Sequence, residues 1–290
     1  MKEDKYVNER LMRDRISILV TFDKTYIKPF RVMIKSLSIN NPKEAFHVWL
    51  LHSAIPQEDV LLLSEYCSAH RMTLTTIDVD RALFHNAPIS KQYPQEMYYR
   101  LLAPWILPKS LDRVIYLDPD ILVINSIRPL WEVALGDYSF AASSHSGVFE
   151  IVNGVNRVRL GNEHDYFNTG VLYMDLKKIR LIGDVEEIFS CVREREGELL
   201  LPDQDVFNLI YGSQILQMDD SIFNYDARYF SAYVFKSKGR HDLDWVLKHT
   251  IILHFCGKQK PWKKRYTGLF SALYKHYMIL SDREGVYSIR

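Results

Sequence analysis

Short apolar runs of strand length alternate with segments of helical period along the first part of the chain. This alternation limits the possible folds more than any other feature. The strand-length runs cover residues 16–22, 46–51, 72–79 and 114–117. A segment with apolar residues at helical spacing follows the first run, a helix start at Pro56 follows the second, and residues 98–107 predict a short helix that breaks around Pro104. Such an order predicts a parallel sheet with right-handed crossovers and helices on both faces.

The second part of the chain is more mixed. Strands are expected at residues 138–143, 171–175, 215–218 and 250–255, and helices near 185–195 and 204–211. The helix after Pro56 is expected to bury Val60, Leu61, Leu63, Tyr66 and Cys67. No internal repeat, low-complexity tract or linker divides the 290 residues. We therefore expect a single compact α/β domain that binds ligands at the carboxyl ends of its strands.

Glycine usage excludes several familiar sites. All 12 glycines lie at position 136 or later. A GxGxxG dinucleotide turn and a GxxxxGK[ST] phosphate loop both need glycines that let backbone amides approach phosphate oxygens, and neither pattern occurs. The GxSxG turn of a serine nucleophile is absent as well. Any nucleotide must be held without a glycine cradle.

Charge and cysteine content narrow the class of protein further. Lys and Arg number 37 against 36 Asp and Glu, a net charge of +1 that argues against a nucleic-acid partner. The three cysteines form no CxxC pair, which favours neither a disulfide framework nor a cysteine zinc site. The N-terminal residues lack the apolar stretch of a signal peptide, and no run approaches the roughly 18 apolar residues of a membrane span. These features predict a cytoplasmic location.

Two acids follow the apolar strand at residues 114–117. Asp118 and Asp120 should lie at the ligand-binding edge of the sheet, on one side if the strand geometry continues. Two carboxylates this close repel each other, and a divalent cation such as Mg²⁺ or Mn²⁺ would relieve the repulsion. Alternatively, the pair is a set of solvated acids that cap the next segment.

A second cluster follows the apolar strand that ends at residue 253. The imidazole of His254 could complete a metal shell, and its nitrogen shifts the preference from Mg²⁺ to Mn²⁺. Gly257 permits a close backbone approach, and Lys258 and Lys260 could neutralise phosphate charge. The alternative is a core histidine beside a solvated basic face.

Six motifs in this order resemble those of family 8 glycosyltransferases, the retaining group that contains bacterial lipopolysaccharide galactosyl- and glucosyltransferases and, more distantly, glycogenin. They are Val20-Thr-Phe-Asp23 followed by Tyr26, Tyr99-Arg100-Leu-Leu, Val114-Ile-Tyr-Leu-Asp-Pro-Asp120, Phe167-Asn-Thr-Gly170-Val-Leu, Pro202-Asp-Gln-Asp205 and His254-x-x-Gly257-x-x-Lys260-Pro-Trp262. The resemblance implies a GT-A fold, Rossmann-like, with a mixed and mostly parallel central sheet. It also implies one domain over residues 1–290, with a nucleotide-binding half at about 14–125, a sugar and acceptor half at about 126–262, and a helical tail at 263–290.

The resemblance implies a UDP-sugar donor and assigns residues to it. The segment Thr21, Phe22 and Asp23 would close on the uridine, with Asp23 accepting from the uracil N3–H and Tyr26 stacking on the base. Without the resemblance, Asp23 is equally well a helix cap. Asp118 and Asp120 with His254 would bind Mn²⁺, or Mg²⁺ as second choice, against the diphosphate. Gly257 and Lys260 would contact that diphosphate.

The sugar end of the donor is assigned in the same way. The resemblance places Arg100 near the donor sugar, although Arg100 alone could form a structural ion pair. Asn168 and the backbone near Gly170 would contact the sugar, although the same residues could simply form a turn.

The resemblance also assigns roles to Asp203, Gln204 and Asp205, just before the helix expected at 206–211. Asp203 would bind donor hydroxyls, and Gln204 would lie near the anomeric carbon. Because the Gln204 amide is neutral and a poor nucleophile, retention favours attack by the acceptor on the face that UDP leaves. Asp205 is a reserve candidate for a nucleophile, and either acid could instead serve the helix N-terminus.

Partners and rival functions follow from these assignments. The expected donor is UDP-galactose or UDP-glucose, and the acceptor is a glycan, a glycolipid or a protein. Five basic residues within 258–265, followed by aromatic and apolar residues at helical spacing, could rest on the inner face of the cytoplasmic membrane, or the segment could pack on the core. The alternatives are a haloacid-dehalogenase-like phosphatase with Asp118 as nucleophile and Asp219-Asp220 as its late acidic motif, or a non-catalytic sugar-nucleotide binder.

Overall fold

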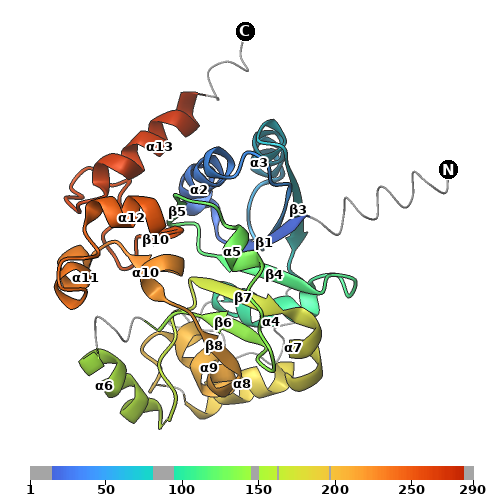
Figure 1. Ribbon diagram of the computed structural model, residues 1–290. Coiled ribbons are helices and arrows are strands. Elements are labelled where there is room, and N and C mark those ends of the chain that lie inside the picture. Colours follow the sequence, from blue (N-terminus) through green and yellow to red (C-terminus); the bar gives the residue numbers. More distant parts are fainter. Residues whose placement is uncertain (1–14, 81–94, 145–149, 162, 196, 284–290) are drawn as a thin grey trace.

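The computed structural model describes residues 15–80, 95–144, 150–161, 163–195 and 197–283 (Figure 1). The N-terminal residues 1–14 and the last residues of the expected tail, 284–290, lie outside this range.

A seven-stranded sheet forms the centre of the described chain, in the order β3-β2-β1-β4-β7-β6-β8. Its strands are β1 (Ile16–Thr21), β2 (Phe46–His52), β3 (Met72–Asp78), β4 (Arg113–Leu117), β6 (Phe140–Ala142), β7 (Val171–Asp175) and β8 (Ile215–Gln217). The first four strands pair in parallel, β7 runs antiparallel to both β4 and β6, and β6 and β8 are again parallel. The prediction of a mostly parallel sheet is confirmed.

A second, smaller sheet lies beside the first in the order β5-β10-β9. It consists of β5 (Ile121–Val123), β9 (Tyr225–Asp226) and β10 (Ile252–His254). The chain passes from the last residue of β4 to the first residue of β5 through Asp118, Pro119 and Asp120 only. The two acids therefore sit where the chain leaves one sheet and enters the other.

Helices cover both faces of the large sheet, as predicted (Figure 1). The α-helices are α2 (Ile27–Asn40), α3 (Gln57–Ala69), α4 (Tyr99–Ile106), α5 (Arg128–Trp131), α6 (Glu150–Leu160), α7 (Leu176–Ile182), α8 (Val185–Glu194), α9 (Pro202–Tyr211), α10 (Asp220–Phe223), α11 (Phe230–Lys236), α12 (Leu243–His249) and α13 (Ser271–Arg283). Short 3₁₀ turns occupy η1 (Lys24–Tyr26), η3 (Gln95–Tyr98) and η4 (Gly212–Gln214). Alternation along β1 divides the core: Ile18 and Val20 pack with α2 and α3, whereas Leu19 packs with α4, α7, α8 and α9.

The C-terminal helix packs on the N-terminal half of the chain. Arg31 donates to the carbonyl of Ser281 at 2.9 Å, and Asn40 donates to the hydroxyl of Tyr277 at 2.9 Å. Lys263, Lys264 and Arg265, which precede this helix, are exposed. The alternative of a terminal helix on the core therefore describes α13, while contact of the basic segment with a membrane stays a prediction.

Three details differ from the sequence predictions. Helix α4 continues through Pro104 to Ile106 because a proline removes only one backbone hydrogen bond, and the strongly apolar buried face keeps the helix in place. Leu61 is 57% exposed, since it lies on the solvent side of α3. Helix α9 begins at Pro202, so the acids expected before the helix lie in its first turn.

Among the helices of the described residues, none combines the length and the apolar composition needed to cross a lipid bilayer.

Candidate active site

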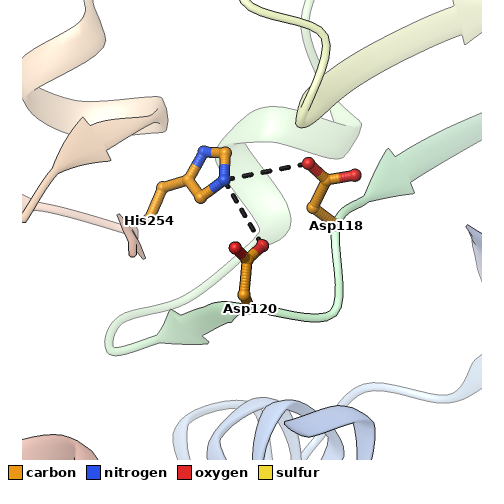
Figure 2. Close-up of side chains that lie close together, drawn as sticks. All are labelled: Asp118, Asp120 and His254. Atoms are coloured by element: carbon orange, nitrogen blue, oxygen red, sulfur yellow. Dashed lines mark ion pairs between the residues drawn. The ribbon is translucent and has the colours of Figure 1, made fainter. Parts of the chain in front are cut away.

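Asp118, Asp120 and His254 come together at the junction of the two sheets (Figure 2). One ligand atom from each of the three side chains lies within 4.8 Å of the others. The His254 Nε2 atom is 3.4 Å from Asp120 Oδ1 and 3.8 Å from Asp118 Oδ2. Two carboxylate oxygens and one imidazole nitrogen suit a divalent cation with octahedral preference, and the nitrogen favours Mn²⁺ over Mg²⁺.

The pairing of β5 with β10 brings the histidine to the two acids. His254 lies opposite Ile121 in this antiparallel pair, one residue after Asp120. The backbone N–H of Phe255 donates to the carbonyl of Asp120 at 3.0 Å and extends the pairing by one step. The strand register alone therefore places the imidazole beside the second acid.

Gly170 makes the close packing of these side chains possible. A Cβ atom at this position would lie 2.3 Å from His254 Cε1 and 2.8 Å from Asp118 Oδ2. The Gly170 carbonyl also accepts the Asp118 backbone N–H at 2.8 Å. No other amino acid fits at this position unless the histidine moves.

Asp118 is held in place by two neighbours. The Tyr116 hydroxyl donates to Asp118 Oδ1 at 2.7 Å, and Arg100 Nη2 lies 3.1 Å from the same oxygen. Arg100 also donates to the carbonyl of Thr169 and lies 3.4 Å from Asp203 Oδ2. The other carboxylate oxygen, Oδ2, is the one that faces His254.

Asp120 is paired with Lys260, whose ammonium group donates to Asp120 Oδ2 and to the carbonyl of Phe255. Burial alone would raise the pKa of Asp120, but His254 and Lys260 outweigh burial and hold this pKa below its usual value. Burial alone would likewise lower the pKa of His254, but Cys256 and Asp120 outweigh it and raise this pKa. The site therefore stabilises charged Asp120.

Asp118 and Asp120 lie at the wall of a cavity of about 560 Å³, to which the first motif also contributes, and His254 lies behind them. The cavity is lined by Thr21, Phe22, Asp23, Tyr26, Glu96, Arg100, Asp118, Pro119, Asp120, Pro202, Asp203 and Lys260. Most of the residues assigned to the nucleotide and the diphosphate are thus brought together. Asp23 also caps η1, because its Oδ1 accepts from the Thr25 backbone N–H at 2.8 Å, so the cap alternative describes a real contact.

Asn168 and Gln204 lie next to this cavity and bond to each other. Gln204 Oε1 accepts from Asn168 Nδ2 at 3.2 Å and from the Thr169 backbone N–H at 3.3 Å. Asn168 Oδ1 accepts from the Gly170 backbone N–H at 3.0 Å. The predicted sugar residues are therefore linked to the glycine that contacts His254.

Two predicted residues lie away from this group. Asp205 has no exposed surface, pairs with Arg159 at 2.7 Å, and accepts from the Tyr166 hydroxyl at 2.6 Å and the Leu200 backbone N–H at 2.7 Å. Both oxygens of the Asp205 carboxylate therefore accept hydrogen bonds from protein groups. Gly257 has a φ of +83° and lines a neighbouring cavity of about 550 Å³ beside Arg228.

Sequence reasoning missed three residues that the site uses. Tyr116 is one of the apolar residues of β4, and its hydroxyl gives no pattern in the sequence. Glu96 lines the cavity from η3, outside every motif. Asn224 is a buried lone asparagine whose Oδ1 lies 2.9 Å from His254 Nδ1. No sequence pattern marks it, because the strand that follows, β9, has only two residues.

The late acids required by a phosphatase serve other purposes. Asp219 caps α10 by accepting from the Ser221 backbone N–H at 2.9 Å, and Asp220 accepts from the Tyr233 hydroxyl at 2.8 Å. Strand β4 also follows three strands of the same sheet rather than opening the fold.

The fold and the comparisons define the class of this protein as a glycosyltransferase of the GT-A type. The galactosyltransferase LgtC, solved with donor and acceptor sugar analogs, has a TM-score of 0.75 at 23% identity, over 91% of this chain and 96% of that one. The chain belongs to glycosyl transferase family 8, whose family model matches residues 17–265. The prediction of this family is confirmed, and the phosphatase alternative is wrong.

Three curated relatives match most of this chain. General stress protein A of Bacillus subtilis is 26% identical over 277 residues, which cover 92% of this chain and 95% of the relative. A lipopolysaccharide 1,2-glucosyltransferase of Escherichia coli K12 is 23% identical over 256 residues, 86% of this chain and 73% of the relative. A lipopolysaccharide 1,3-galactosyltransferase of Salmonella typhimurium is 25% identical over 265 residues, 86% and 73%.

Proposed function

We propose that this chain is a retaining hexosyltransferase that moves galactose or glucose from a UDP-sugar to a glycan, glycolipid or protein acceptor with the help of Mn²⁺. The observation that carries the proposal is the convergence of Asp118, Asp120 and His254, with both acids lining a cavity that the first motif also lines. The relatives named as glucosyl- and galactosyltransferases support the two donor sugars.

In this proposal the donor contacts both halves of the chain. Residues 14–125 hold the nucleotide, with Thr21, Phe22, Asp23 and Tyr26 around the uridine. Residues 126–262 hold the sugar and the acceptor, with Asn168, Gly170 and Asp203 near the sugar. The arrangement is supported by the cavity lining, to which Asp23 and Tyr26, the two acids and Asp203 of α9 all contribute.

Breaking the glycosidic bond leaves negative charge on the diphosphate of UDP, and the protein must stabilise that charge. A divalent cation held by Asp118, Asp120 and His254 would supply positive charge to the departing group. Lys260 lines the same cavity beside Asp120 and would add a second positive charge. Arg100 lies between Asp118 and Asp203, so its part is to hold these two carboxylates in position.

Retention of configuration is best explained by attack of the acceptor on the face that UDP leaves. The amide oxygen of Gln204 already accepts two N–H groups, and the amide is neutral. Asp205 could act as a nucleophile only after losing Arg159, Tyr166 and two backbone donors. On the same-face route, the acceptor oxygen bonds to the anomeric carbon, the bond to UDP breaks, and the departing phosphate takes the acceptor proton.

Thermal unfolding with UDP, UDP-galactose, UDP-glucose or GDP, each with Mn²⁺ or EDTA, tests the proposal. A ligand at 100 times its dissociation constant should add about 2.7 kcal/mol of stability. We expect this from the uridine nucleotides only with Mn²⁺, and not in Asp120→Asn. Asp219→Asn is the matched control because Asp219 is an exposed cap that asparagine can replace. No stabilisation of the wild type by any nucleotide would overturn the proposal.

A non-catalytic binder is distinguished by the release of UDP. The proposed enzyme should liberate UDP slowly from its donor with water as acceptor. A chain that is stabilised by UDP-sugars but releases no UDP, with or without lipopolysaccharide-type oligosaccharides, would instead be a binder.

A further inference from the structure

A buried asparagine connects the two ends of the site. Asn224 lies between α10 and β9, and its side chain has no exposed surface. Its Oδ1 is 2.9 Å from His254 Nδ1, and its Nδ2 is 2.9 Å from Asn168 Oδ1. One amide group therefore touches both the histidine at the metal position and the asparagine at the sugar position.

Two backbone N–H groups fix the direction of every hydrogen bond in this chain of contacts. The Gly170 N–H can only donate, so the Asn168 atom that faces it is the oxygen. That oxygen also faces Asn224, which must therefore present its NH₂ to Asn168 and its own oxygen to His254. At the other end, the Thr169 N–H requires the oxygen of Gln204, which then receives the NH₂ of Asn168.

The consequence for His254 is a defined proton position. Because Asn224 Oδ1 can only accept, Nδ1 must carry a proton, and in the neutral ring the lone pair of Nε2 then faces Asp118 and Asp120. A histidine that binds a metal through one ring nitrogen usually donates from the other to an oxygen acceptor, which fixes the ring and its tautomer.

We propose that Asn224 is a positioning residue with two separable functions. Through Oδ1 it holds His254 as the Nδ1–H tautomer with Nε2 free for the cation. Through Nδ2 it holds Asn168 and, beyond it, the Gln204 side chain. The proposal rests on the proposed function, in which His254 binds the cation and Gln204 lies at the reacting carbon.

Two substitutions separate these functions. Asn224→Leu has a similar size and loses both bonds. Asn224→Asp keeps an oxygen for His254 but has no NH₂ for Asn168. Asn41→Leu is the matched control: Asn41 is also buried, and it accepts from the Ile127 N–H at 2.8 Å and donates to the Leu37 carbonyl at 3.0 Å, but it lies outside the site. It measures the general effect of losing a buried amide.

The first measurement needs no metal and so does not depend on the proposed function. The ring nitrogens of His254 are observed by ¹⁵N NMR in metal-free protein at a pH where the ring is neutral, and are assigned by difference from His254→Gln. We expect the Nδ1–H form in the wild type, Asn224→Asp and Asn41→Leu, and its loss in Asn224→Leu. The Nε2–H form in the wild type, or an unchanged tautomer in folded Asn224→Leu, would overturn the proposal.

The second measurement separates Mn²⁺ binding from turnover. Free Mn²⁺ is measured by electron paramagnetic resonance with UDP present, and turnover by UDP release from UDP-galactose. Asn224→Leu should bind Mn²⁺ about 10–100-fold more weakly, the usual effect of losing a partner of a metal-binding histidine. Asn224→Asp should bind Mn²⁺ within about threefold of wild type but turn over about 10–100-fold more slowly, because Gln204 loses its fixed position.

The outcomes distinguish the two proposals. If the wild type binds no Mn²⁺, the proposed function fails, and the tautomer measurement still decides on Asn224. If Asn224→Asp and Asn224→Leu lose Mn²⁺ binding and turnover to the same degree as Asn41→Leu, Asn224 has only a structural role and the proposal is wrong.

Discussion

Two buried aspartates, Asp120 and Asp205, lie in regions that give the same carboxylate very different hydrogen-bond partners. Both are buried, with exposed fractions of 5% and 0%, and both pair with a basic residue, Lys260 for the first and Arg159 for the second. Asp205 receives donors from a guanidinium, a phenol and two backbone N–H groups. Asp120 shares one oxygen with Lys260 and directs the other at the Nε2 atom of His254.

The comparison shows that burial and charge do not by themselves make a carboxylate functional. Around Asp205 the protein supplies a hydrogen bond for nearly every lone pair, which leaves no room for a ligand. Around Asp120, Lys260 takes one oxygen, and the other faces a histidine beside a second acid at cation-binding spacing, next to a cavity. At Asp120, a cation could supply the positive charge that protein donors supply at Asp205. Asp205 needs no cation.

The largest expected effect is a loss of stability on Asp205→Asn. The substitution removes the buried charge that faces Arg159; breaking a fully buried ion pair costs about 3–5 kcal/mol, and the cost is lower here because Arg159 is 20% exposed and keeps the Glu198 carbonyl as an acceptor. Urea denaturation should show this loss, while UDP release per folded molecule should stay within about threefold of wild type. Asp219→Asn is the control that should change neither quantity. A stable Asp205→Asn protein without turnover would instead make Asp205 part of the chemistry and break the comparison.

A smaller effect is expected from Gly170→Ala, which tests the Asp120 region without removing a ligand. The added Cβ would lie 2.3 Å from His254 Cε1, so the ring must move away from the carboxylates. We expect Mn²⁺ affinity to fall about 10–100-fold, comparable with losing a partner of a metal ligand. Gly136→Ala is the control for added strain, because Gly136 has a φ of +55° and no atom within 4 Å of the added Cβ. Equal Mn²⁺ affinities in Gly170→Ala and wild type would contradict the geometry.

The smallest effect is a pH dependence of stability in the metal-free protein. Folding lowers the pKa of Asp120, so its charged form stabilises the protein above the unfolded pKa of about 3.9, and this contribution is lost as pH falls through the folded pKa. Below about pH 4 the Tm should therefore fall more steeply in wild type than in Asp120→Asn, both in EDTA. Parallel curves for the two proteins would show that the Asp120 charge contributes nothing to folding.

Much of this site could be predicted from the sequence. Apolar periodicity shows where strands end, and in such a sheet ligands bind at the carboxyl ends of the strands. The positions of Asp118, Asp120 and His254 after their strands follow from that rule alone. The difference between Asp203 and Asp205 does not. In a helix that begins at Pro202, residues two apart point roughly 200° apart, so Asp203 faces the cavity and Asp205 the interior.

Most of the small sheet and its buried polar contacts could not be predicted from the sequence, for a different reason. Strands β5 and β9 have three and two residues, too few for a period to be recognised, whereas β10 lies within the strand predicted at residues 250–255. Asn224 acts through hydrogen bonds to Asn168 and His254, which lie far away in the chain, and Tyr116 acts through the hydroxyl of an otherwise apolar strand residue. Such contacts depend on tertiary packing, which leaves no local pattern.

The passage of the chain from the large sheet into the small one at Asp118 and Asp120 also bears on the order of folding. The parallel strands β1 to β4 are joined by local crossovers, but Lys260, which neutralises Asp120, follows it by 140 residues. Closing a loop of that length is slow compared with forming the nearby crossovers. We therefore expect both acids to stay hydrated until β10 docks. The charged junction of the two sheets would then be among the last parts of the molecule to lose its water.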